Sequence, residues 1–406
     1  MSACEQPGLM SVDTALGILL ERVPSPPQME TIALSQALGR VLAEDVVSSV
    51  DVPPADNSAM DGYCARLTDI QPGKVLPVSQ RIPAGAVATP LQPGTAARIF
   101  TGAELPENAD VVIMQENTEQ SGDGILIHES PSLRQHIRPQ GQDIQTGSVI
   151  LTQGSRIRPQ DMGLLASVGV NEIKAYRPLK VAIFSTGDEI VEPGQPLEKG
   201  QIYNSNRFTL IGMIQHFGWE VLDLGIIADD LEATKAALQQ ATQADLIVTS
   251  GGVSVGEEDH VKHALDALGE VQLWKLAIKP GKPFTFGHVQ GTPFMGLPGN
   301  PAAVLMTFSI LCRPWLLKAQ GAANLDVLTV QAKARFSIRK PAVRQQYMQA
   351  QLTLDESGQQ ASLYPNQSSG VLSSASWANA VVVVPPNTVV AEGDSVNVIP
   401  FNSIFN

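Results

Sequence analysis

Cysteine is scarce in this sequence, and its placement excludes two kinds of architecture. The three cysteines stand at positions 4, 64 and 312, far apart and odd in number. They form neither a metal-binding spacing nor a disulfide framework. A reducing compartment fits this pattern, so we expect a cytoplasmic protein.

Long apolar runs and an excess of positive charge are also missing. No apolar run approaches the roughly 18 residues of a membrane helix. The N-terminus lacks the basic start and apolar stretch of a signal peptide, so we expect no membrane partner. The formal net charge is −13. Because an acidic surface repels a polyanion, we also expect no nucleic-acid partner. An anionic small ligand would need a local basic pocket or helix N-termini.

The first 177 residues show mixed helical and β patterns. The chain has 406 residues, which predicts about two to four domains. Amphipathic spacing predicts a helix over 10–23, with Ser11 as a cap, and a second helix over 34–46. Short alternating segments between Gly- and Pro-rich turns predict a small β domain over 58–139. A short helix is predicted over 160–168.

From residue 178 to about 321, apolar β-branched runs alternate with helical patterns. Strands are predicted at 181–184, 221–227, 246–249 and 271–278, and helices at 207–217, 231–240, 259–268 and 302–317. Runs this continuous are typical of parallel strands that are buried on both faces. The alternation predicts an open, doubly wound α/β domain. After 321 the β pattern returns at 327–336, 346–354 and 381–384, which predicts a small C-terminal barrel or sandwich.

Open α/β sheets bind ligands at the carboxyl ends of their strands, and five unusual loops lie in this region. They are Ser185-Thr-Gly-Asp-Glu189, Ala228-Asp-Asp230, the Gly-rich loop from Ser250 to Asp259, Lys279-Pro-Gly-Lys-Pro283 and Leu297-Pro-Gly-Asn-Pro-Ala302. Glycines after Ser250 let backbone N–H groups approach an anion closely. Pro301 suits the first position of a helix whose free N–H groups can face an anion. Lys275 and Lys279 add positive charge.

Three carboxylates, Glu189, Asp229 and Asp259, follow three different predicted strands. Beside a phosphate-like ligand they would repel it unless a hard cation sits between them, and oxygen ligands with phosphate suit Mg²⁺. Simpler interpretations stay open. Asp229 or Asp230 can cap the helix that begins at Leu231, the paired glycines can form an ordinary turn, and Lys279 can be a surface lysine. His260 and His263, beside acidic residues, raise the alternative of zinc, without a cysteine or third histidine in support.

A second cluster lies outside the α/β region. Its parts are the polar loop from Asp56 to Gly62, Thr101 with Gly102 after a predicted strand, and Gly141-Gln-Asp143. Each part alone would be a turn. Five strings, read together and in this order, carry a resemblance: Asp56-Asn-Ser-Ala-Met-Asp-Gly, Ser185-Thr-Gly-Asp-Glu, Ser250-Gly-Gly-Val-Ser-Val-Gly, Lys279-Pro-Gly-Lys-Pro and Leu297-Pro-Gly-Asn-Pro. They resemble the molybdopterin molybdenumtransferase family, which includes the C-terminal enzyme domain of gephyrin.

The resemblance covers residues 9 to about 401 and implies an α/β multi-domain fold. It implies a doubly wound, molybdopterin-binding-like α/β domain over 178–325 and an elongated helical spacer over 8–51 and 139–177. An inserted β domain would span 52–138, and a C-terminal β-barrel domain would span 326–406. The implied reaction inserts molybdate into adenylylated molybdopterin and releases AMP. The implied cofactor is Mg²⁺, with Zn²⁺ or another divalent cation as alternatives. A homodimer and a transient contact with the molybdopterin adenylyltransferase are also implied.

The resemblance also implies site residues, position by position. The family's acidic site falls on Asp61, Asp143, Glu189, Asp229 and Asp259, of which the last three would hold the metal, and its basic residues fall on Lys275 and Lys279. Its ligand-lining loops match Thr101, Ser250, Gly251, Gly252, Pro298 and Pro301, with Arg344 and Ser369 near the pterin site. Two departures stand out: Gln142 replaces a common Glu, and Gln349 replaces a common Arg, which would weaken anion contact there.

Two other functions compete with this one. The α/β domain also resembles the molybdopterin adenylyltransferase, which would require neither the Asp61 loop nor the C-terminal domain. A scaffold that uses the fold only for protein binding is the other alternative. In a scaffold the acidic loops would be vestigial, and their intact state argues against it.

Overall fold

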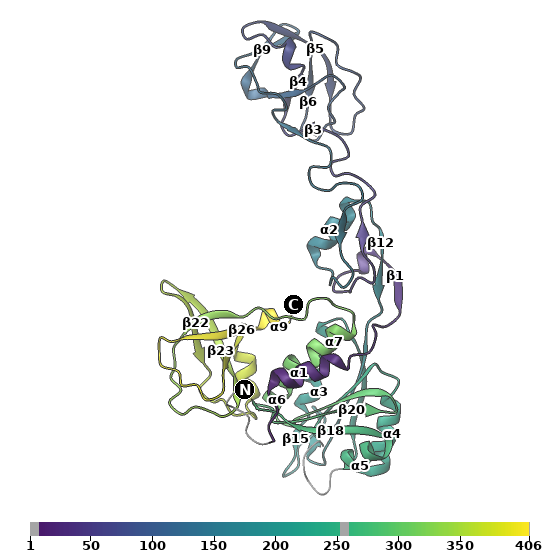
Figure 1. Ribbon diagram of the computed structural model, residues 1–406, viewed down its shortest axis with the longest axis vertical. Coiled ribbons are helices and arrows are strands. Elements are labelled where there is room, and N and C mark those ends of the chain that lie inside the picture. The colour runs from purple at the N-terminus through teal and green to yellow at the C-terminus, as the bar shows by residue number, and fades with distance from the viewer. Residues whose placement is uncertain (1–7, 252–259, 406) are drawn as a thin grey trace.

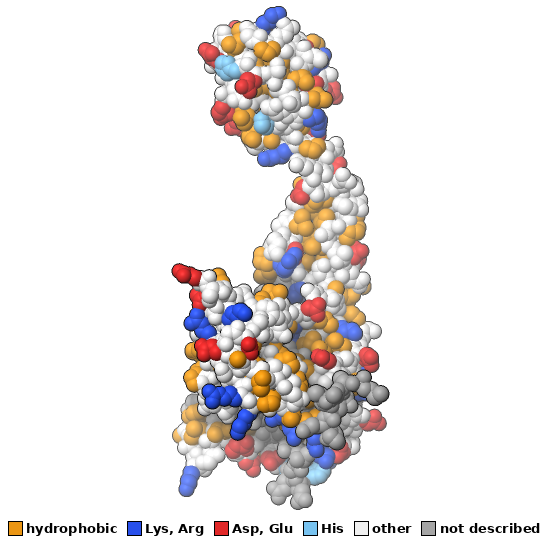
Figure 2. Space-filling model, turned by 60° about the vertical axis from the view of Figure 1, so that its left-hand side comes forward, with side chains coloured by type: hydrophobic (Ala, Val, Ile, Leu, Met, Phe, Trp, Pro, Cys, Tyr) orange, Lys and Arg blue, Asp and Glu red, His pale blue; other side chains and the backbone are white. Residues whose placement is uncertain are grey.

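The computed structural model describes residues 8–251 and 260–405. The molecule is elongated (Figure 1). A β domain lies at one end and joins through a narrow spacer to a larger body, which contains the α/β domain and the C-terminal barrel. The spacer is also narrow in the space-filling view, where acidic and basic side chains are interspersed over the body (Figure 2). The predicted multi-domain α/β fold class is confirmed. The predicted domain borders stay predictions.

The α/β domain contains a six-stranded sheet in the order β16-β13-β17-β21-β20-β18. Its strands are β13 (Lys180–Thr186), β16 (Glu220–Ile227), β17 (Leu246–Ser250), β18 (Gly269–Lys275), β20 (Pro283–Val289) and β21 (Thr292–Leu297). The first four in the sheet order are parallel, but β20 is antiparallel to both β21 and β18. The sheet is therefore mixed rather than wholly parallel. Two reversals return β18 to the common direction, so it ends at the same edge as the parallel strands.

Helices cover this sheet where the sequence predicts them. They are α3 (Ser205–His216), α4 (Leu231–Ala241), α5 (His260–Leu268) and α6 (Pro301–Thr307), which continues through a π-helical turn (Phe308–Cys312) into α7 (Arg313–Ala319). The stretch Pro301–Ala319 is long and apolar enough to cross a membrane by composition, but 89% of it is buried inside the protein. It is the core helix of the domain, since the fully buried Trp315 belongs to it.

Helix α1 (Val12–Glu21) begins at its predicted cap, where the Thr14 backbone N–H donates to Ser11 Oγ at 3.1 Å. Its buried Leu19 belongs to the same core cluster as Trp315, and Figure 1 shows α1 beside α7. The N-terminal helix thus packs on the α/β domain and not in the spacer.

The spacer contains one helix, α2 (Pro159–Ser167), and two small antiparallel pairs. These are β1 (Met29–Ala33) with β12 (Glu172–Tyr176) and β2 (Val46–Val47) with β11 (Val149–Leu151). The predicted helix over 34–46 is wrong, because only a 3-10 turn, Leu34–Gln36, forms there. Gly39 has a φ of +75°, and the Leu42 N–H donates to the Ser155 carbonyl. Pairing with distant segments therefore replaces the local helix.

The inserted β domain folds into a six-stranded sheet, with strand order β7-β4-β6-β5-β9-β8. Its strands are β4 (Gly62–Ala65), β5 (Val75–Ile82), β6 (Ala96–Ile99), β7 (Val111–Met114), β8 (Thr118–Ser121) and β9 (Gly124–Ile127), and a short pair, β3 (Asn57–Ser58) with β10 (Ile137–Arg138), adjoins the spacer. Small and β-branched side chains such as Ala97 and Val112 fill its core.

The C-terminal domain is a closed five-stranded barrel. Its strands are β22 (Val330–Ala334), β23 (Gln345–Asp355), β24 (Gly358–Leu363), β25 (Ala380–Val384) and β26 (Ser395–Pro400), and β23 closes the ring by pairing with β25. Two short helices, α8 (Leu372–Trp377) and α9 (Phe401–Ile404), lie beside it. A two-residue strand of the α/β domain, β19 (Ile278–Lys279), pairs with β23 and ties the two domains together.

Candidate anion-binding site

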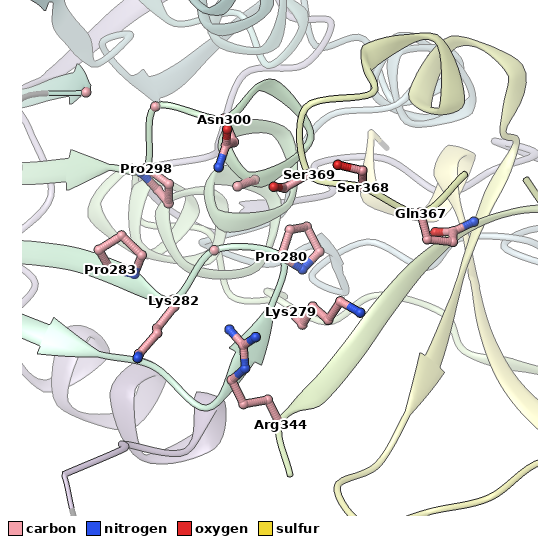
Figure 3. Close-up of a pocket in the computed structure, with 14 residues that line it drawn as sticks. Lys279, Pro280, Lys282, Pro283, Pro298, Asn300, Arg344, Gln367, Ser368 and Ser369 are labelled. Atoms are coloured by element: carbon pink, nitrogen blue, oxygen red, sulfur yellow. The ribbon is translucent and has the colours of Figure 1, made fainter. Parts of the chain in front are cut away.

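A cavity of about 630 Å³ lies between the carboxyl edge of the α/β sheet and the C-terminal barrel (Figure 3). Loops from both domains line it: Gly251, Lys279 to Pro283, Pro298 to Asn300 and Ala303 from the α/β domain, and Arg344 and Gln367 to Ser369 from the barrel. The loops after β17, β18 and β21 therefore meet here, as expected for an open α/β sheet.

Three basic side chains give the cavity a local positive charge in an acidic protein. Lys279, Lys282 and Arg344 all line it. The Arg344 guanidinium is held by a hydrogen bond from its Nη1 to the Ile278 carbonyl at 3.1 Å. Because β19 pairs with the start of β23, Arg344 from the barrel lies next to the lysine loop. These three side chains can make charge-assisted hydrogen bonds to an oxyanion.

Glycines bring the backbone close to this space. Gly251 has a φ of +87° and Gly281 a φ of +105°, in the left-handed region that favours glycine. A Cβ atom on Gly281 would lie 2.4 Å from Thr307 Oγ1 in helix α6. The turn between Lys279 and Lys282 can therefore lie on α6 only because position 281 carries no side chain.

The barrel loop that faces these cations is fixed by a glutamine clamp. Gln367 Oε1 accepts a hydrogen bond from the Gln349 N–H at 3.0 Å, while its Nε2 donates to the Gln349 and Tyr364 carbonyls at 2.9 Å each. The Ser369 carbonyl accepts from the Ala302 N–H at 3.0 Å, at the start of α6. Ser368 and Ser369 are thus held at the cavity by both domains.

Gln349, the position where the family often has Arg, lies behind this loop and is 3% exposed. Its Nε2 donates to Met306 Sδ at 3.4 Å. Its Oε1 is buried and has no hydrogen-bond partner among the described residues. Its side chain is therefore packed beneath the cavity wall and makes no contribution to the cavity charge.

The structure brings together part of the predicted site. Five predicted residues line the cavity: Gly251, Lys279, Pro298, Arg344 and Ser369. Ser250 ends β17 and Pro301 begins α6, each next to a lining residue. Lys275 is exposed at the end of β18 and is absent from the described cavity lining. The prediction missed four lining residues with polar side chains, Lys282, Asn300, Gln367 and Ser368, of which the first two belong to recognised loops.

The predicted metal ligands are only partly described. Glu189 and Asp229 are exposed, and the Glu189 carboxylate folds back over Gly187, where a Cβ would lie 2.6 Å from Oε2. Asp230 is the N-cap of α4, since its Oδ1 accepts from the Ala233 N–H at 2.9 Å, which leaves Asp229 without a capping role. Asp259 and Gly252 lie outside the described residues. Within residues 8–251 and 260–405, no three metal-ligating side chains gather, for zinc or for any other ion.

The second predicted cluster forms in the distant β domain. Asp61 Oδ1 accepts hydrogen bonds from the backbone N–H and the hydroxyl of Thr101, both at 2.8 Å. These bonds, the backbone one first, hold the pKa of Asp61 below its ordinary value. Asp143 is exposed in the connection to the spacer, where its N–H donates to the Val52 carbonyl. Figure 1 shows this β domain far from the sheet that carries the cavity.

A cation- and glycine-lined cavity at the edge of an α/β sheet, closed by a barrel, defines an anion-binding protein of the α/β class. Three family models match the chain in order. The MoeA N-terminal region (domain I and II) matches residues 10–169, a probable molybdopterin binding domain matches 182–318, and the MoeA C-terminal region (domain IV) matches 331–401.

Named relatives match over almost the full length. A molybdopterin molybdenumtransferase of Haemophilus influenzae is 41% identical over 402 residues, covering 98% of this chain and 100% of that protein. One from Nostoc sp. is 35% identical and covers 94% and 91%. The crystal structure of a molybdopterin biosynthesis MoeA protein from Pyrococcus horikoshii matches with a TM-score of 0.84, 30% identity and coverage of 97% and 100%. The chain belongs to the molybdopterin molybdenumtransferase family.

Proposed function

We propose that the protein inserts molybdate into adenylylated molybdopterin and releases AMP. The observation that supports this most directly is the cavity lined by Lys279, Lys282 and Arg344, with serines and bare glycine backbone around them. Positive charge and backbone N–H groups suit molybdate and phosphate oxygens. Curated relatives that match over nearly the whole chain carry the name of this activity.

In this proposal the cations offset the charge of the substrate phosphates and hold molybdate beside the dithiolene. Two dithiolene sulfurs bind molybdenum and replace one molybdate oxygen, which leaves as water with the two thiol protons. Water adds across the phosphoanhydride bond, so AMP leaves with its phosphate, and the pterin keeps its own phosphate and the molybdenum. Molybdate is activated by its positive neighbours, so no nucleophilic side chain is required. The described cysteines support this, because Cys64 and Cys312 are buried, and burial raises the pKa of the Cys64 thiol to about 12.

The direct test is incubation of the purified protein with adenylylated molybdopterin, with and without molybdate. We expect AMP release that depends on molybdate. Failure of a folded sample to release AMP would contradict the proposal. ATP-dependent adenylylation of molybdopterin by this chain alone would instead favour the adenylyltransferase alternative.

A divalent cation belongs to the proposal as well. Glu189, Asp229 and Asp259 would hold Mg²⁺, with Zn²⁺ or another divalent ion as the alternative. The fit rests on donor chemistry, since carboxylates that follow separate strands suit a hard cation beside phosphate. Asp229 is exposed, and the cap of helix α4 is Asp230, so the Asp229 carboxylate is compatible with this role. The ion would supply charge neutralisation at the substrate phosphates. Loss of AMP release in EDTA and its recovery with Mg²⁺ would test the requirement.

We further propose a homodimer in which each site is shared. Asp61, Thr101 and Asp143 lie in or beside the distal β domain, and the elongated shape keeps them away from the cavity of their own chain (Figure 1). A second copy could bring its distal domain to that cavity. We also propose a cytoplasmic location and a transient contact with the adenylyltransferase that supplies the substrate.

A further inference from the structure

Two arginines stand side by side on the outer face of the distal β domain. Strands β5 and β6 are parallel neighbours, and their register pairs Arg81 with Arg98. The next residues in each strand, Ile82 and Ile99, are buried in the core. Because side chains alternate along a strand, both arginines point to the opposite, outer face. Like charges paired across strands destabilise a sheet, so this pair calls for a compensating partner.

Aromatic rings hold both guanidinium groups in place. Arg81 Cζ lies 4.6 Å from the ring centroid of Phe100, and Arg98 Cζ lies 4.8 Å from the same centroid and 5.0 Å from that of Tyr63. Stacking of this kind orients a guanidinium but does not neutralise its charge. We name Arg81, Arg98, Phe100 and Tyr63 the arginine–aromatic cluster. It directly adjoins Asp61 and Thr101, since Thr101 follows Phe100 in the chain.

The two arginines differ in how many of their guanidinium N–H groups have a hydrogen-bond acceptor. Arg98 donates from Nη1 to the Gly62 carbonyl at 3.0 Å and from Nη2 to Gln115 Oε1 at 2.6 Å. Arg81 is exposed, and within the described part of the chain it makes no side-chain hydrogen bond or ion pair. The β domain over 52–138 has ten acidic and six basic residues. The pair is therefore a local concentration of positive charge on a domain that is acidic as a whole.

We propose that the arginine–aromatic cluster is a second oxyanion-binding site, which takes a phosphate group of the substrate through Arg81. A planar guanidinium with free donors can bind phosphate through two parallel hydrogen bonds. Arg98, which already donates to the Gly62 carbonyl, adds positive charge beside the Asp61 carboxylate. The identity of the ligand, adenylylated molybdopterin, rests on the proposed function; the anion site itself does not.

Inorganic pyrophosphate serves as the probe, because it carries the phosphoanhydride without the pterin. The double variant Lys279→Ala/Arg344→Ala first removes two of the three positive charges of the sheet-edge cavity, so that pyrophosphate binding there is suppressed; this is the silenced background. In that background we expect pyrophosphate to bind by calorimetry, and Arg81→Met to weaken binding by about tenfold or more. Lys74→Met removes one exposed charge from the same domain and should leave binding unchanged. Arg81→Lys, which keeps the charge, should bind better than Arg81→Met, provided that melting curves show all variants folded.

The result that overturns the inference is pyrophosphate binding that is absent from the silenced background or equal with and without Arg81. The enzymatic arm uses Arg81→Met alone and should raise KM for adenylylated molybdopterin more than it lowers kcat. If the wild-type protein releases no AMP, the proposed function fails, while binding that depends on Arg81 would still support this site. Normal AMP release with binding that ignores Arg81 would defeat this inference alone.

Discussion

Lys279 carries one of the three positive charges at the cavity, and its place is fixed by the pairing of β19 with the barrel. A charge-assisted contact to an oxyanion contributes about 1.5–3 kcal/mol. We therefore expect Lys279→Ala to raise the molybdate concentration needed for half-maximal AMP release by roughly tenfold or more. Lys333→Ala, an exposed lysine of the barrel outside the cavity lining, is the matched control. An unchanged molybdate dependence in folded Lys279→Ala protein would remove Lys279 from the site.

Thr101 offers a test of how the Asp61 carboxylate is held. Thr101→Val removes the hydroxyl donor but keeps the backbone N–H, which is the larger cause of the lowered pKa. We expect the pKa of Asp61 to rise part of the way to its ordinary value, as measured by carboxyl-carbon NMR titration. A pKa that stays where it is in wild type would mean that the hydroxyl bond is absent in solution.

The same pair has a defined pH dependence. A lowered carboxyl pKa contributes stability above the ordinary pKa, and this stability is lost as the pH falls through the folded-state pKa. The stability difference between wild type and Thr101→Val should therefore be present at neutral pH and disappear in acid. Because Asp61 stays ionised at neutral pH in both proteins, any loss of activity there would reflect its orientation and not its charge.

Sequence reasoning found the loops of the site more readily than the side chains that face it. The strings around Ser250, Lys279 and Leu297 were recognisable, and all three reach the cavity. Which lysine faces inward depends on the turn after β18, where the Leu276 N–H bonds to the Lys282 carbonyl. That turn places Lys282 in the wall and leaves Lys275 outside it. Which lysine lines the cavity depends on the position at which the turn begins, and the types of the residues in the loop do not determine that position.

At the scale of elements, local periodicity succeeded where a segment folds against its neighbours in sequence. Helices α3 and α4 and strands β13 and β17 lie where they were predicted. It failed over 34–46, where backbone pairing to residues more than a hundred positions away replaces the helix. Local periodicity also predicted one strand over 271–278 where the structure has β18 and β19. The two are separate because β19 pairs with a strand of a different domain.

The turn at Gly281 yields a prediction at this scale. Gly281→Ala would combine a left-handed backbone with a 2.4 Å approach to Thr307 Oγ1. Gly218 also has a positive φ, but a Cβ there would have no atom within 4 Å. Gly218→Ala therefore measures the free-energy cost of the left-handed backbone alone. We expect Gly281→Ala to be about 1–3 kcal/mol more destabilising than Gly218→Ala in denaturant unfolding. The double variant Gly281→Ala/Thr307→Ala should recover most of that excess. If it recovers none, the close approach is not the cause.

At the scale of the whole molecule, the narrow spacer separates two sets of polar residues that the proposed function requires in one place. Asp61 and Thr101 lie on the distal domain, while Lys279 and Arg344 lie at the cavity of the body (Figure 1). The sequence indicated an extended spacer, but it could not indicate how far apart the two sets lie. Interlocked copies would bring each distal domain to the other chain's cavity, and a two-fold dimer makes two such sites.

A mixed dimer distinguishes a shared site from a site within one chain. Asp61→Ala and Lys279→Ala/Arg344→Ala homodimers should each release little AMP. In a heterodimer with one variant per subunit, purified through two different tags, a shared arrangement puts both lesions into one site and leaves the other intact. We then expect about half of the wild-type AMP release. If each chain carries its own complete site, both sites of the heterodimer stay defective and no activity returns. Sedimentation of the wild-type protein as a monomer would reject the shared site before any variant is made.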